Sequence, residues 1–307
     1  MNYSMILESY ESCAAELRAL EYDIAQEADG SSVDSSTVRA SSATDNANND
    51  LNDTANGDVA KSNTKFRERV KKLIETIRAH ITMILDKFSQ FVTNLMTTNK
   101  GFLAEVADYK KKYKVLDAVK IINWSYPNNP DQFLMTPLNL LGGEIQRQTA
   151  NLAKFNSIPE DSILLMGEQE RLKAILKIMN APSDIENIPQ YYLYLRTQFR
   201  GKKQEQTIRG EAADRYIVIV QNYDRKKTVF LQSSKLIKSQ VDSTNATLQR
   251  VANDSNADNE TKARVLKMST ALTSMINIYS NLAVLANRMY GEYIINCRTI
   301  VRHLYEK

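Results

Sequence analysis

The chain has 307 residues, of which 43% are hydrophobic and 25% are charged, and its formal net charge is +4. This length allows one large domain or two small ones, and this hydrophobic content is enough to build a core. The composition therefore excludes a chain that is unstructured throughout, and we expect most of it to be globular.

The sequence predicts neither a membrane-spanning helix nor a signal peptide. The longest apolar runs, at residues 163–166 and 217–220, are far shorter than the roughly 20 residues that a membrane-spanning helix needs. The N-terminus has no basic segment followed by an apolar run, and it carries Glu8 and Glu11 where a signal peptide would be apolar. We therefore predict a protein that is not secreted, has no transmembrane segment and stays inside a cell.

The charges are unevenly distributed along the chain. Residues 1–63 contain twelve acidic and three basic residues, a net charge of −9, whereas the remaining residues contain 24 acidic and 37 basic residues, a net charge of +13. A body of this charge is attracted to polyanions such as nucleic acid, acidic lipid or an acidic protein surface. The alternative is the ordinary solvated surface of a Lys-rich helical protein.

The N-terminal region divides into two segments. Residues 1–28 space their apolar side chains as a short amphipathic helix does, which predicts a helical leader. Residues 29–63 are almost entirely Ser, Asp, Asn, Ala, Thr and Gly, with too little apolar surface to offset chain entropy. We expect this second segment to be a disordered acidic linker that tethers the leader to a basic helical body, residues 64–307.

A long amphipathic helix is predicted from Thr64 onward, where Thr64 would be the N-cap and apolar residues follow at steps of three or four. Its first turns are crowded with basic residues, which we predict as a polyanion-binding group: Lys65, Arg67, Arg69, Lys71, Lys72 and Arg78. Such a pattern over residues 65–91 is also found in helices that lie on anionic membranes. The alternative, which we favour, is a core helix with a basic solvent face. The helix should continue past Gly101 to Tyr113.

Residues 120–190 contain several prolines, which predict short helices joined by turns. Residues 163–166 and 171–179 are expected to be helical, residues 121–126 extended, and Gly142 with Gly143 a turn. An aromatic group with interleaved arginines follows, and it has the composition of a nucleic-acid stacking surface or of core aromatics with flanking charges: Tyr191, Tyr192, Tyr194, Arg196, Phe199 and Arg200. We expect the core alternative.

The last hundred residues give the clearest pattern. Six residues recur every seven positions, as in a coiled coil: Tyr216, Tyr223, Phe230, Ile237, Thr244 and Val251. After a polar stretch at residues 253–259, a second series alternates steps of four and three: Leu272, Ile276, Tyr279, Ala283, Ala286, Tyr290, Tyr293, Cys297, Ile300 and Leu304. Residues 211–307 should therefore form a long antiparallel helical hairpin, and we predict an all-α fold, an elongated helical bundle.

No motif for chemistry emerges from the sequence. His80 and His303 are far apart, and no Gly-rich loop follows a strand. Cys13 and Cys297 lie at opposite ends of the chain, which fits neither a disulfide framework nor a metal site, so we expect buried or inert thiols. We therefore predict no catalytic residues, no cofactor and no metal site, and a protein that is not an enzyme.

The acidic leader ends in Ile24, Ala25, Gln26, Glu27 and Ala28. This segment resembles the N-terminal targeting peptides of internal virion proteins of tailed bacteriophages, which direct those proteins into the prohead and are clipped after a Glu that follows a small or aliphatic residue two positions earlier. In this chain the small residue Ala25 holds that position, and the aliphatic Ile24 is three before the Glu. The resemblance implies a processing site at Ala25, Gln26, Glu27 and Ala28.

The resemblance also implies a function: a virion-associated structural or internal head protein, located in the virion or the host cytoplasm, that acts by binding. Its partners would be other virion proteins or the capsid interior, with DNA or an anionic membrane surface as further candidates and oligomerisation through the helical hairpin. Cleavage after Glu27 would remove six acids and one base and change the net charge from +4 to +9. The alternatives are a peripheral membrane-binding helical protein and a non-specific nucleic-acid-binding protein.

Overall fold

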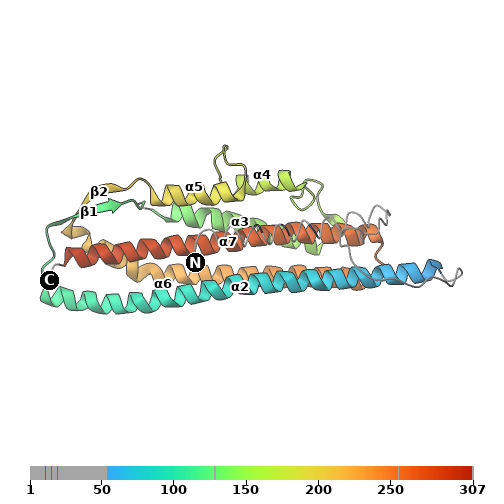
Figure 1. Cartoon of the computed structure of the whole chain (residues 1–307), viewed down its shortest axis with the longest axis horizontal. Helices are drawn as coiled ribbons and strands as arrows, with labels where there is room; N and C mark the ends of the chain where they lie inside the picture. Colours follow the sequence, from blue (N-terminus) through green and yellow to red (C-terminus); the bar gives the residue numbers. More distant parts are fainter. Residues whose placement is uncertain are drawn as a thin grey trace, which may run out of the picture.

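Three long helices run along the length of the molecule, and shorter elements form a second layer over them (Figure 1). The long helices are α2 (Thr54–Lys112), α6 (Ala213–Asn253) and α7 (Asn259–Leu304). The computed structural model describes residues 54–127, 129–254 and 256–305, and isolated residues of the leader; in parts of α2 and α6 it describes only the backbone. The predicted all-α class is confirmed.

Long-range contacts set the directions of these helices. Arg67 Nε on α2 donates to Ala252 O at the end of α6 (3.2 Å), and Lys110 Nζ near the end of α2 pairs with Asp214 Oδ1 at the start of α6 (2.7 Å), so α2 and α6 are antiparallel. Arg302 near the end of α7 pairs with Glu105 of α2, so α2 and α7 are parallel. The loop at residues 254–258 therefore joins α6 and α7 as the predicted antiparallel hairpin.

The helix α7 is the centre of the bundle. It lies between α2 and α6 on one side and α3 and α5 on the other (Figure 1), and it contacts all four. Every residue of the predicted second series is buried, from Leu272 at 0% exposure to Leu304 at 0%. Of the first series, Tyr223, Ile237, Thr244 and Val251 are buried as well. The two seams are therefore real packing surfaces.

The second layer consists of α3 (Asp131–Ala153), α4 (Glu168–Ile178) and α5 (Ile188–Arg200), with the single turns η2 (Phe155–Ser157) and η3 (Gly210–Ala212). At one end of the bundle β1 (Ala118–Trp124) pairs antiparallel with β2 (Gln204–Arg209). Partners in this ladder include Val119 with Ile208, and the register shifts between Ile121 and Trp124. The extended segment expected at residues 121–126 is thus part of a strand, whereas β2 was not predicted.

The N-terminal boundary of the body was predicted ten residues too late. The helix α2 begins at Thr54, so Thr64 is an interior residue of the helix and the C-terminal part of the predicted linker has a helical backbone. Of the predicted leader, the structure describes Glu11, Ala15 and Ala19, which are helical and exposed. The rest of residues 1–53 lies outside the described residues.

Two further predictions within residues 120–190 were wrong. Residues 163–166 form turns rather than a helix, whereas α4 covers most of the predicted helix at residues 171–179. The helix α3 runs unbroken through Pro137, Gly142 and Gly143, where a turn was expected. A proline inside a helix loses one hydrogen bond and costs about 3 kcal/mol. Packing of apolar residues of α3 on α7 offsets this cost, since Leu134, Leu138 and Leu141 are at most 1% exposed.

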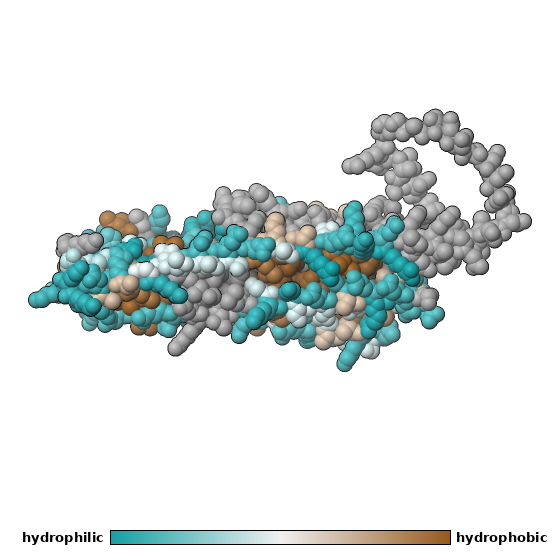
Figure 2. Space-filling view, turned by 90° about the horizontal axis from the view of Figure 1, so that it is seen from below, coloured by the Kyte–Doolittle hydropathy of each residue, from teal (hydrophilic) through white to brown (hydrophobic). Residues whose placement is uncertain are grey.

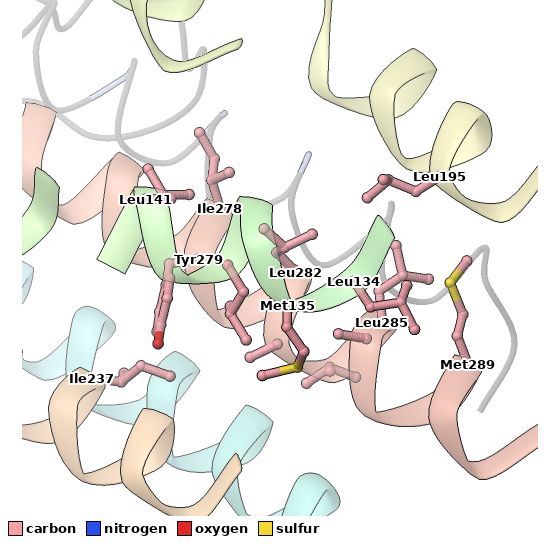
Figure 3. Close-up of a cluster of buried hydrophobic side chains, with 14 of the residues drawn as sticks. Leu134, Met135, Leu141, Leu195, Ile237, Ile278, Tyr279, Leu282, Leu285 and Met289 are labelled. Atoms are coloured by element: carbon pink, nitrogen blue, oxygen red, sulfur yellow. The ribbon is translucent and has the colours of Figure 1, made fainter. Parts of the chain in front are cut away.

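Gly142 is needed for close helix packing rather than for a turn. A Cβ at this position would lie 3.1 Å from Cε2 of Tyr279, whose ring is almost fully buried. Figure 3 shows Tyr279 between Leu141 of α3 and Ile237 of α6. Gly143, in contrast, has no heavy atom within 4 Å of the place that a Cβ would take. The two glycines therefore differ in function although they are adjacent.

Gly142→Leu should lower the free energy of unfolding by about 1–3 kcal/mol, because the added side chain overpacks the contact with Tyr279. Gly143→Leu is the matched control, and it should be neutral or stabilising by up to about 1 kcal/mol, since leucine favours a helix more than glycine does. Urea unfolding followed by circular dichroism measures both. Equal stability of the two variants would contradict the packing role of Gly142.

Candidate interaction surface

The predicted polyanion-binding residues all lie in the first part of α2, on the helix that forms one edge of the long layer (Figure 1). The described side chains of this group are exposed: Arg67, Lys71, Lys72 and Arg78. Only the backbone of Lys65 and Arg69 is described. The exposed acids Glu68 and Glu75 lie on the same stretch, so its described side chains carry a smaller but still positive net charge, which can contact a polyanion.

The apolar residues between these cations are buried in the bundle. Val70, Leu73, Ile74, Ile77 and Ile81 are each at most 5% exposed. The view from below shows hydrophilic residues over much of this face, with separate hydrophobic patches along its middle (Figure 2). This arrangement is the core helix with a basic solvent face that the sequence analysis favoured. A described apolar stripe that packs on α6 and α7 is not available to enter a lipid layer.

Arg67 also has a structural role. Its Nε donates to the carbonyl oxygen of Ala252, in the last turn of α6, where helix carbonyls lack intrahelical partners. At the same end of the bundle, Arg250 Nη2 donates to the carbonyl of Ala153, the last residue of α3, at 3.3 Å. Both arginines place positive charge at a helix C-terminus, where the helix dipole favours it. Lys71, Lys72 and Arg78 are therefore the better candidates for binding an external group.

A shallow cleft of about 320 Å³ lies beside these capping contacts. It is formed where the end of α3 meets the end of α6, and its lining residues are Ala153, Lys154, Phe155, Asn156, Ser157, Arg250, Val251 and Asp254. The guanidinium of Arg250 lies 5.8 Å from the centre of the Phe155 ring. Arg250 is thus already engaged with Phe155 and with Ala153 O within the chain.

The aromatic group of α5 belongs to the core. Tyr191, Tyr192 and Phe199 are at most 1% exposed, and Tyr192 donates a hydrogen bond to Ile278 O of α7 at 2.9 Å. Arg200 forms a two-nitrogen contact with the carboxylate of Glu292 on α7, with distances of 2.7 to 3.2 Å. The prediction of core aromatics is confirmed for Tyr191, Tyr192 and Phe199, which are not available for stacking on bases, whereas Tyr194 is half-buried.

Cys297 lies under a cluster of aromatic side chains at the sheet end of the bundle. Tyr293, on the preceding turn of α7, contacts Trp124, Tyr126 and Phe199. Cys297 itself is fully buried, and burial raises the pKa of its thiol to about 12. The thiol therefore stays neutral at physiological pH, which confirms for this residue the prediction of a buried, inert cysteine.

Native protein treated with iodoacetamide at pH 8 should remain unmodified at Cys297, because an ordinary thiol has a pKa of about 8.5 whereas this one is buried and protonated. In denaturant the same residue should be alkylated completely. Peptide mass spectrometry reads out the Cys297 peptide separately from any other cysteine. Rapid alkylation of Cys297 in the folded protein would contradict its burial.

The remaining predicted site is the processing site at the end of the leader. Ala25, Gln26, Glu27 and Ala28 are outside the described residues. Among the described residues, no group of three or more His, Cys, Asp or Glu side chains is placed to hold a metal ion. A search of the same residues finds no helix with the length and apolar content to cross a membrane.

A scan against protein-family models, a search of the curated proteins and a search of the solved structures each found no match to the chain.

Proposed function

We propose that this chain is a structural protein of a tailed-bacteriophage particle, which acts by binding and contacts packaged DNA through the basic residues of α2. The observation that carries the proposal is the exposure of Lys71, Lys72 and Arg78 on a helix whose described apolar stripe is buried in the bundle. The resemblance of residues 24–28 to clipped prohead-targeting peptides supports the location in a virion.

The charge distribution supports the same proposal. Residues 64–307 carry a net charge of +13, and removal of the leader after Glu27 would raise the net charge of the remaining chain to +9. Each phosphate that a lysine or arginine neutralises releases a condensed counterion, so a cationic face gains affinity for DNA, and this gain is largest at low salt. Processing would thus favour the form of the protein that lies beside packaged DNA.

A membrane-surface role is the weaker alternative. Such a role needs an amphipathic helix whose apolar face enters the lipid boundary. The apolar residues of α2 from Val70 to Ile81 are covered by its neighbours within the chain, so only the cations would remain for an electrostatic contact with acidic lipid. We favour DNA over acidic lipid as the partner of these cations, because the phosphates of duplex DNA form the denser array of negative charge.

Lys71→Glu combined with Lys72→Glu should weaken binding to duplex DNA and reduce the slope of log affinity against log salt by about 2, because two phosphate contacts are lost. The matched control is Lys173→Glu combined with Lys177→Glu, which makes the same charge change on α4, in the layer opposite α2 (Figure 1). Fluorescence anisotropy across a salt series gives both quantities. An equal loss in the two variants would show that binding follows net charge and not the α2 surface.

Mass spectrometry of the protein from purified particles should find a mature N-terminus at Ala28, because the leader resembles peptides that are clipped after Glu. Protein expressed without the phage protease is the control and should retain the leader. A particle-derived chain that begins at Met1 would rule out the processing step, and absence of the protein from purified particles would rule out the proposed function.

A further inference from the structure

The cations near the start of α2 lack the acidic partners that a later cation of the same helix has. Within the part of the chain that the structure describes, Lys71, Lys72 and Arg78 are exposed and form no ion pair. Near the other end of the helix, Lys110 pairs with Asp214 of α6 at 2.7 Å. The early cations of α2 are therefore open to an acidic group from outside the bundle.

The most acidic part of the same chain is the part that precedes α2. Residues 1–53 contain eleven acidic residues and two basic ones, a net charge of −9. Six of these acids and one of the bases lie in residues 1–27, the leader up to the predicted cut, which therefore has a net charge of −5. The exposed stretch of α2 has the opposite sign, even with Glu68 and Glu75 counted.

The acids of the leader have a helical spacing. The residues of the leader that the structure describes are helical and exposed. Glu16, Asp23 and Glu27 follow one another at intervals of seven and four positions. In a helix these intervals place three carboxylates on one face, separated by about 10 Å and about 6 Å along the axis.

Three cations of α2 have the same two intervals in the opposite order. Arg67, Lys71 and Arg78 are separated by four and then by seven positions, and all three are exposed. Arg67 uses Nε for its contact with Ala252 O, which leaves its two Nη groups for a carboxylate. A leader helix lying antiparallel to α2 would bring three ion pairs into register: Glu27 with Arg67, Asp23 with Lys71, and Glu16 with Arg78.

The chain between the leader and α2 has the length that this arrangement needs. A leader with Glu27 beside Arg67 would end about 20 Å along the axis from Thr54, where α2 begins. Residues 28–53 join these two points. A flexible chain of about 26 residues has a root-mean-square end-to-end distance of about 30 Å, so a tether with this composition reaches without strain. Such a match gives the leader an effective concentration on the order of mM at the cations.

We propose that the leader, residues 1–27, docks as an antiparallel helix on the exposed cations of α2 in its own chain. The docking follows from charge and spacing and does not require DNA. Its consequence rests on the proposed function, because a docked leader covers part of the surface that we assign to DNA. Cleavage after Glu27 would then free these cations for DNA, in addition to changing the net charge of the chain.

Energy transfer between two dyes on the full chain measures the docking. The dyes are attached at Ala15→Cys and Gln90→Cys, both at exposed positions, in a Cys13→Ser background, since Cys297 is buried. Transfer should be high at low salt and should fall in about 1 M salt, where the Debye length is about 3 Å. Transfer that increases with protein concentration would place the leader on a second copy of the chain and would overturn the proposal.

Charge-reversal variants of the same labelled chain test the register. Glu16→Lys combined with Asp23→Lys should lower the transfer to its high-salt level. Adding Lys71→Glu and Arg78→Glu should restore the transfer, because the same pairs then form with their signs exchanged. The matched control makes the same charge change on α4: Lys173→Glu with Lys177→Glu. Equal transfer in all of these variants, or an equal rescue by the α4 control, would overturn the proposal.

DNA binding separates this inference from the proposed function. Glu16→Gln combined with Asp23→Asn should raise the affinity for duplex DNA on the order of tenfold more than the control Glu170→Gln combined with Asp184→Asn, which neutralises exposed acids of the second layer. Equal affinities would overturn the competition between leader and DNA. Register-dependent energy transfer in a chain that does not bind DNA would support the docking and contradict the proposed function.

Discussion

The burial of α7 on all sides is the constraint on which the rest of the structure depends. From Met268 to Asn287 almost every residue of this helix is buried, including polar ones such as Asn277 and Ser280. Such a helix is stable only when other elements cover its whole circumference. The helices α2, α3, α5 and α6 do so, and their positions in the fold follow from this requirement (Figure 1).

Several small polar residues buried on α7 satisfy their hydrogen bonds within the helix. The hydroxyls of Thr273 and Ser280 donate to the carbonyls of Ser269 and Ile276, one turn earlier, so they need no partner from another element. Tyrosines from the surrounding helices add specific contacts, for example Tyr223 of α6, which donates to Asn287 at 3.2 Å. Such pairs fix the axial register of the bundle, because a slip of one turn would leave buried polar atoms without partners.

The same constraint determines what the surface can do. Apolar residues of α2, α3 and α5 are used to cover α7, and the charged residues of these helices face outward. The cations of α2 that we propose for DNA binding are the solvent side of a core helix, and their function follows from charge rather than from an apolar insertion. On α7, Arg298 is the exception, because its Nε and Nη1 are buried without a hydrogen-bond partner, whereas the neighbouring Arg302 pairs with Glu105 of α2.

The sequence predicted the elements whose packing is regular and could not predict those that depend on distant residues. The steps of three and four from Leu272 to Leu304 identified the hairpin, since they repeat over many turns. The unbroken course of α3 through Pro137 and Gly142 was missed because packing on Tyr279 and its neighbours overrides local propensity.

The strand β2 was missed because it is mostly polar, and only Ile208 is buried. For the candidate surface, the exposure of Lys71, Lys72 and Arg78 followed from the helical period. The contact of Arg67 with Ala252, 185 residues away, required the fold.

Hydrogen exchange measured by mass spectrometry on the full chain tests the central position of α7 most directly. Amides from Met268 to Asn287 should exchange more slowly than any other part of the protein, through openings that approach global unfolding. Those of the exposed strand β2 should exchange orders of magnitude faster. If the α7 amides exchanged as rapidly as those of β2, this helix could not be the buried centre of the bundle, and the account would be wrong.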